Sequence, residues 1–227
     1  MTMIDSVRRA LVIAPHPDDE VLGCGGTMMR LAQLGAEVHV AILTKAMPPR
    51  FRPEISEAGR REAREAHKLL RVADTHLMDF PAAELDTVPH AQLNAALGEL
   101  MGRVAPDTLF IPFVGDVHLD HQLVFLSSMV AARPRLGAGP ARVLSYETLS
   151  ETNWYAPGVT PTFAPNVYVD ISEQLDAKIT AFQCYASQVK KAPDERSVEA
   201  IRSLAILRGA TVHRSAAEAF MLLREIA

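Results

Sequence analysis

The stretch Ala10-Leu11-Val12-Ile13-Ala14-Pro15-His16-Pro17-Asp18-Asp19-Glu20 determines how the rest of this chain is interpreted. Its apolar first part, residues 10–14, predicts a buried β-strand. The two prolines keep the following backbone extended, because a residue before proline avoids helical angles. Asp18 and Asp19 suit the cap and the first turn of a helix that continues to residue 34. The stretch therefore predicts a strand that delivers a histidine and acidic side chains to one end of a sheet.

The acidic side chains of this stretch allow two interpretations. In the first, they only cap the helix. In the second, His16 and Asp19, three residues apart around the turn, bind one cation, and Asp18 is free for another task. A second cluster, His118-Leu119-Asp120-His121, follows a later apolar run and favours the second interpretation.

Composition sets the broad class of the protein. The 227 residues are 48% hydrophobic and 22% charged, which is typical of one soluble domain spanning residues 1–227. A net charge of −4 gives no excess of positive charge for binding nucleic acid. Two cysteines are too few for a disulfide framework or a thiolate zinc site. We find no signal peptide and no apolar run near about 18 residues, so we expect a cytoplasmic protein without stable membrane insertion.

Strand and helix patterns alternate along most of the chain. Strands are predicted at residues 10–14, 37–44, 75–78, 107–112, 142–146 and 167–171, the last at a sheet edge. Helices are predicted at residues 20–34, 56–70, 89–104, 122–132, 172–184, 197–208 and 216–226. This alternation indicates an α/β fold, a Rossmann-like, doubly wound, mostly parallel sheet with helices on both faces.

The two polar clusters follow two of these strands, so in a parallel sheet both lie on the same rim. Two imidazoles and one carboxylate form a ligand set for zinc that leaves positions open for water and substrate. Such an ion lowers the pKa of bound water to roughly 7. A neighbouring carboxylate can act as general base, and a further histidine can stabilise an oxyanion. This chemistry is metal-assisted hydrolysis of an amide or ester. The residues alone do not choose between Asp18 and Asp19, or between His118 and His121, as ligands.

The same residues carry a resemblance to a known family. Residues 14–20, the glycines of Gly23-Cys24-Gly25-Gly26, Thr27 and the 118–121 cluster resemble the PIG-L/LmbE-like zinc-dependent N-deacetylases. Weaker similarities are Arg60-Arg61-Glu62, Ser187-Gln188 and residues 217–220. Members of this family remove acetyl groups from N-acetylglucosamine-type sugars. The resemblance covers nearly the whole chain and implies a small N-acetylated substrate and zinc as the cofactor. Iron is the alternative ion, because sites with two histidines and one aspartate accept both metals. Members of the family often form homo-oligomers.

The resemblance also implies a role for each matching residue. The metal ligands would be His16, Asp19 and His121. Asp18 would be the general base, and His118 would stabilise the tetrahedral intermediate. Asp120 would lie behind a histidine and fix its tautomer. Arg60 would bind the substrate.

Several residues have no single interpretation. Arg60 and Arg61 each either bind the substrate or lie on a solvated helix face. His213 and Glu218 either line the pocket or are structural, and Trp154 and Tyr155 either stack on a sugar or clamp a loop. We interpret the glycine cluster as close packing of the first helix against the sheet rather than as a phosphate cradle. Substrate specificity is expected to lie in the loops 46–53, 79–88 and 150–165.

Two alternative functions remain open from the sequence. The same metal site could hydrolyse a different small amide or an ester. A sugar-binding module that keeps the fold without catalysis would be expected to have lost Asp18 or a metal ligand, and all of these residues are present.

Overall fold

The computed structural model describes residues 2–134, 139–156 and 158–227. Within these residues, seven strands form one sheet in the order β3-β2-β1-β4-β5-β7-β6. The strands are β1 Arg9–Ala14, β2 Glu37–Lys45, β3 Asp74–Pro81, β4 Thr108–Ile111, β5 Arg142–Tyr146, β6 Val167–Asp170 and β7 Ala217–Glu225. The helices are α1 Asp19–Gln33, α2 Pro53–Leu69, α3 His90–Val104, α4 Leu119–Ala131, α5 Leu175–Gln183 and α6 Val198–Thr211.

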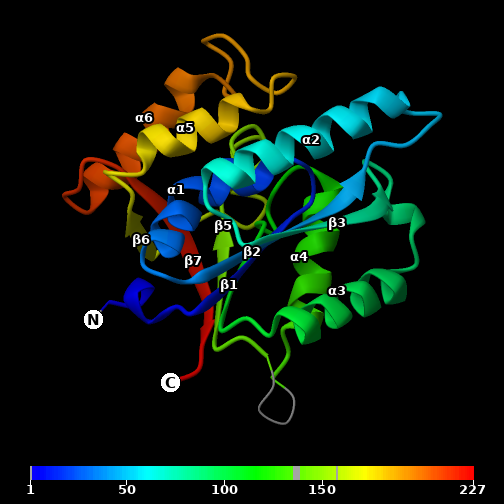
Figure 1. Ribbon diagram of the computed structural model, residues 1–227, viewed down its shortest axis with the longest axis horizontal. Coiled ribbons are helices and arrows are strands. Elements are labelled where there is room, and N and C mark those ends of the chain that lie inside the picture. Colours follow the sequence, from blue (N-terminus) through cyan, green and yellow to red (C-terminus); the bar gives the residue numbers. More distant parts are fainter. Residues whose placement is uncertain (1, 135–138, 157) are drawn as a thin grey trace.

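The helices cover both faces of the sheet. Helices α1, α2, α5 and α6 lie on one face, and α3 and α4 lie on the other (Figure 1). Alternate residues of β1 enter the two cores, with Val12 in the first and Leu11 in the second. Both residues are completely buried. The predicted α/β class, with a doubly wound and mostly parallel sheet, is confirmed.

The order of the strands places a switch point beside β1. That strand pairs in parallel with β2 on one side and with β4 on the other. The connections that leave the carboxyl ends of β1 and β4 therefore diverge, and they leave a crevice between them. Both polar clusters of the sequence follow these two strands.

Close packing of α1 against the sheet explains the glycine cluster. A Cβ atom on Gly23 would lie 2.2 Å from the Tyr146 ring, and one on Gly26 would lie 2.7 Å from the Ile171 side chain. The Tyr146 hydroxyl in turn donates a 2.8 Å hydrogen bond to the Ile13 carbonyl. The prediction that these glycines serve helix packing is confirmed, and the packing fixes the helix that carries Asp19.

The predicted carboxy-terminal helix is wrong. Residues 217–225 form β7, an antiparallel strand between β5 and β6. Ala, Glu, Met and Leu, which make up most of this segment, favour helices. Pairing with a strand on each side and the burial of Phe220 against Phe110 override that propensity. A short apolar run does not distinguish a buried strand from a buried helix by its periodicity.

Other boundaries also differ from the predicted ones. Helix α4 begins at Leu119 rather than at residue 122, so its first turn includes His121. Helix α5 begins at Leu175 rather than at residue 172, and α2 begins already at Pro53. The predicted edge strand at residues 167–171 is confirmed as β6. Residue 157 of the predicted loop 150–165 lies outside the described residues.

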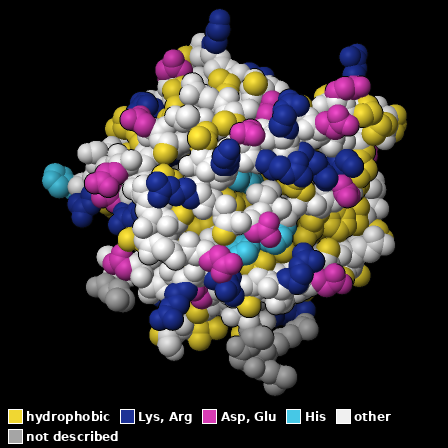
Figure 2. All heavy atoms as spheres, in the orientation of Figure 1, with side chains coloured by type: hydrophobic (Ala, Val, Ile, Leu, Met, Phe, Trp, Pro, Cys, Tyr) yellow, Lys and Arg dark blue, Asp and Glu magenta, His cyan; other side chains and the backbone are white. Residues whose placement is uncertain are grey.

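The surface carries mixed charges. On the face drawn in Figure 2, Lys and Arg side chains are interspersed with Asp and Glu side chains. Among the helices that the structure describes, none combines the length and apolar character needed to cross a membrane.

Candidate active site

The carboxyl ends of β1 and β4 hold the candidate site. His16 lies in the turn after β1, and Asp19 is the first residue of α1. His118 caps the amino end of α4, and its Nδ1 accepts a hydrogen bond from the Asp120 backbone N–H. His121 lies in the first turn of α4. Two segments far apart in the sequence therefore bring their polar side chains to one crevice.

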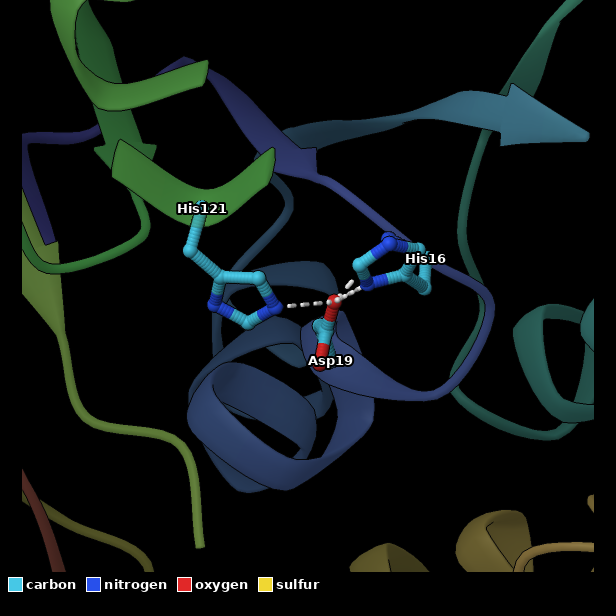
Figure 3. A group of neighbouring side chains, drawn as sticks. All are labelled: His16, Asp19 and His121. Atoms are coloured by element: carbon cyan, nitrogen blue, oxygen red, sulfur yellow. Dashed lines mark hydrogen bonds and ion pairs between the residues drawn. The ribbon is translucent and has the colours of Figure 1, made fainter. Parts of the chain in front are cut away.

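His16 and His121 face Asp19 from two sides (Figure 3). Asp19 Oδ2 lies 3.3 Å from His16 Nδ1 and 3.2 Å from His121 Nε2. One ligand atom from each of the three residues lies within 4.8 Å of the others, a spacing that a single ion can bridge. Asp19 and His121 are completely or almost completely buried.

A second carboxylate holds each of the two histidines from behind. His16 Nε2 lies 2.9 Å from Asp120 Oδ2, and His121 Nδ1 lies 2.8 Å from Asp116 Oδ2. Asp116 also accepts a 2.5 Å hydrogen bond from the Thr152 hydroxyl. A carboxylate at one ring nitrogen keeps the proton there, so the lone pair of the opposite nitrogen points toward Asp19.

The residues of this group fit a bound divalent ion. Asp19 Oδ1 and His121 Nε2 are buried atoms without a hydrogen-bond partner among the described residues. Buried polar atoms are rarely left without a partner. An ion coordinated by both imidazoles and the carboxylate supplies the missing partner. The structure therefore contains a His/Asp site suited to a metal ion.

Without an ion, protons on His16 and His121 supply the positive charge at this site. Burial opposes a charge on His16, but hydrogen bonds to Asp120 and Asp19 raise its pKa to about 9. The pKa of His121 is likewise raised by Asp19 and Asp116 against the effect of burial. These shifts show how strongly the site attracts positive charge.

His118 differs from the other two histidines. Burial and the nearby His16 lower the pKa of His118 to about 4, so its imidazole is neutral at pH 7. Because its Nδ1 accepts the Asp120 N–H, the ring proton lies on Nε2. His118 lines the same cavity as Asp18, so this N–H is a donor available at the site.

Asp18 lies beside the candidate ligands in a strained conformation. Its φ of 111° is unfavourable for a side chain other than glycine, and its backbone N–H contacts Glu20 Oε2 at 3.2 Å. The Asp18 carboxylate accepts a 2.8 Å hydrogen bond from Arg196 Nη1. Burial raises the pKa of Asp18, and the Arg196 guanidinium opposes that effect.

A cavity of about 260 Å³ opens onto these side chains. Its lining includes His16, Asp18, Arg60, His118, Glu151 and Arg196. Arg60 donates 2.6 Å hydrogen bonds to the Met78 carbonyl and to Asp79, so its guanidinium is held at the wall. The cavity is of a size for a single sugar ring rather than a large ligand.

Other residues considered from the sequence lie away from this cavity. Arg61 and His213 are exposed, and Trp154 is 66% exposed with its indole N–H on Glu195. Tyr155 lines a separate hollow. Glu218 lies on β7, not on a helix, and accepts hydrogen bonds from the N–H groups of Gly26 and Thr27 and from Lys178. Its role is therefore structural.

Sequence reasoning missed Asp116 and Arg196. Asp116 stands five residues before His121, a spacing that no motif marks. Arg196 lies in the irregular segment between α5 and α6, where it also contacts Gln188 Oε1 at 2.6 Å. The weaker family similarity at Ser187-Gln188 is the only feature of the sequence which indicates that this segment approaches the site.

The fold and the site together define a metal-dependent hydrolase. A family model described as GlcNAc-PI de-N-acetylase (PIG-L) matches residues 11–132, just over half of the 227 residues. The chain belongs to this PIG-L family, and its class of activity is N-deacetylation.

Similar proteins cover most of the chain. The uncharacterized deacetylase YaiS of Escherichia coli is 30% identical over 78% of this chain and 90% of its own length. The diacetylchitobiose deacetylase of Thermococcus kodakarensis is 28% identical over 90% of this chain and 79% of its own length. The crystal structure of the conserved protein TT1542 from Thermus thermophilus has a TM-score of 0.78 at 27% identity, with 96% of each chain covered.

Proposed function

We propose that this chain is a zinc-dependent enzyme that removes the N-acetyl group from an amino sugar or a small sugar conjugate. The observation that carries the proposal is a pair of buried atoms, Asp19 Oδ1 and His121 Nε2, that have no hydrogen-bond partner in the described part of the chain and lie next to His16 at the switch point of the sheet. His16, Asp19 and His121 would hold the ion. A divalent ion held by these residues would make a water-derived nucleophile available at neutral pH, because such an ion lowers the pKa of water to about 7.

The neighbouring side chains supply the proton transfers. Asp18 accepts a proton from water, and Arg196 orients its carboxylate and opposes the rise in its pKa that burial causes. The His118 Nε2–H donates to the acetyl oxygen as negative charge develops there. A C–O bond to the acetyl carbon forms and the C–N bond breaks. The proton held by Asp18 passes to the nitrogen, so a free amine and acetic acid leave, and the acid ionises to acetate at neutral pH.

The cavity supports an N-acetylated sugar as the substrate. Its volume of about 260 Å³ suits one sugar ring with its acetamide group. Lys45, Arg60 and Glu62 on its wall can form hydrogen bonds with hydroxyl groups. A similar protein is named after the disaccharide diacetylchitobiose, which agrees with this class.

The test is a product assay with metal-loaded protein. Acetate and free amine are measured for N-acetylglucosamine, diacetylchitobiose, an N-acetyl amino acid and a simple acetate ester. We expect release from the sugars with zinc, and none after removal of the metal by a chelator. Release only from the amino acid or the ester would contradict the proposed substrate, and full activity after metal removal would contradict the metal mechanism.

A further inference from the structure

A second group of histidine and acidic side chains lies at the opposite end of the sheet. His39 on β2 and Asp74 on β3 are paired positions of the parallel ladder, and His76 follows two residues later. Glu37 precedes His39 by two residues on β2. Because side chains alternate along a strand, all four project from the same face of the sheet.

The spacing of these side chains matches the coordination shell of one ion. His39 Nδ1 lies 3.2 Å from His76 Nε2, which lies 3.7 Å from Asp74 Oδ2. One ligand atom from each of these three residues lies within 4.8 Å of the others. Ligands at about 2.0–2.1 Å from a tetrahedral zinc ion are about 3.3 Å apart. The group therefore needs little rearrangement to coordinate an ion.

His39 is left with an unsatisfied nitrogen. Its side chain is largely buried, at 9% residue exposure, and its Nε2 has no hydrogen-bond partner among the described residues. Glu37 Oε1 lies 3.1 Å from this nitrogen, although the geometry does not form a hydrogen bond. Arg9 holds the other oxygen of Glu37 at 2.7 Å. The chain places the Glu37 carboxylate beside Nε2, while the opposite ring nitrogen, Nδ1, faces His76 Nε2 and is the nitrogen positioned to bind an ion.

We propose that His39, Asp74 and His76, with Glu37 beside them, form a second divalent-cation site. Two imidazoles with one or two carboxylates suit zinc and similar borderline ions rather than magnesium or calcium. Because β3 is the edge strand, the ion would join that edge to β2. The site is independent of the candidate active site, since Lys45 on the cavity wall is six residues further along β2, about 20 Å at 3.3 Å per residue.

The stoichiometry of bound zinc tests this proposal. Untagged protein is stripped of metal with a chelator, equilibrated with Zn²⁺ at a buffered free concentration, and analysed for zinc per chain. We expect two ions in the unchanged protein, one in His76→Gln, one in Asp74→Asn and one in His121→Ala. The control His90→Gln removes an exposed histidine away from both groups and should keep two. One ion in the unchanged protein, or two in His76→Gln, would overturn the proposal.

A stability measurement separates ion binding from misfolding. Asp74 is exposed, and Asn at this position keeps an oxygen for the Thr75 N–H, so Asp74→Asn should fold normally. Zinc should raise the melting temperature of His121→Ala, in which only the second site remains, and should leave that of His121→Ala/His76→Gln unchanged. Deacetylase activity of His76→Gln should match that of the unchanged protein. Activity lost while two zinc ions are still bound would refute the second site.

Discussion

His121 Nδ1 lies 2.8 Å from the buried carboxylate of Asp116, while the opposite nitrogen of the same ring faces Asp19. Asp116→Asn keeps the shape of this side chain and removes its charge. We expect zinc affinity to fall about 10–100-fold, because the ring loses the anion that fixes its tautomer and raises its basicity. Competition with a chelator measures the change, and the exposed Asp176→Asn is the control. Equal affinities in both variants would contradict the assigned role of Asp116.

Asp18→Asn should separate metal binding from turnover. The amide keeps the volume of the side chain and does not accept a proton from water, so turnover should fall about 10²–10⁴-fold. Zinc content should stay at the level of the unchanged protein, because Asp18 lies outside the His16–Asp19–His121 group. Metal analysis and an acetate-release assay on the same preparation give both values. Loss of zinc together with activity would make Asp18 a ligand instead.

Arg196→Gln should move the acidic limb of the pH–rate profile. Burial raises the pKa of Asp18, and the guanidinium of Arg196 counteracts that rise. Without the guanidinium the pKa of Asp18 rises further, so the general base becomes protonated at a higher pH and activity is lost sooner on acidification. We expect Arg196→Lys to restore part of the profile, since the charge returns without the planar fork. Measurement of kcat/KM from pH 5 to 9 tests this, and an unmoved acidic limb in Arg196→Gln would count against it.

Zinc binding should release protons. The pKa of about 9 at His16 and the raised pKa of His121 mean that both rings carry an extra proton in the metal-free protein at pH 7. Each ring must lose that proton to bind an ion, so the apparent affinity should rise about tenfold per pH unit for each proton released, until both rings are already neutral in the metal-free protein. Calorimetry in buffers of different ionisation enthalpy counts the protons. An affinity that is constant between pH 6 and 9 would contradict these pKa shifts.

Gly23→Ala should destabilise the fold, because its Cβ would lie 2.2 Å from the Tyr146 ring. The cost of overpacking is about 1–3 kcal/mol. The matched control is Gly98→Ala in α3, where a Cβ meets nothing within 4 Å. That change should stabilise the protein by about 0.5–1 kcal/mol through helix propensity. Thermal or urea unfolding compares the two variants, and equal stabilities would show that α1 can move away from the sheet at little cost.

Strand and helix periodicity was sufficient to predict the class of the fold and the shared rim. The run before His16 and the run before His118 each had the length and composition of a buried strand, and strand–helix alternation implied that they are parallel. For β7 the same reasoning failed, since residues 217–225 consist largely of good helix formers. Their strand conformation depends on β5 and β6, which are remote in sequence.

The candidate site was predictable only where side chains stand close together in the sequence. His16 and Asp19 belong to one turn, and His118 and His121 belong to another. Arg196 reaches Asp18 across 178 positions, and no motif includes Arg196 itself. Asp120 was expected behind a histidine, but the residues did not reveal that the histidine is His16, on the other segment.

The contacts of Asp120 also limit how the substrate preference of such an enzyme can change. Besides holding His16, its carboxylate accepts the backbone N–H groups of Ala83 and Leu85, in the segment that follows β3. Any insertion that displaces this segment withdraws two hydrogen bonds from the anion that orients His16. The backbone of this segment is therefore constrained. A change in substrate preference that reshapes it would also weaken the binding of the ion. Side-chain replacements that leave the positions of these two amides unchanged should not weaken the binding of the ion.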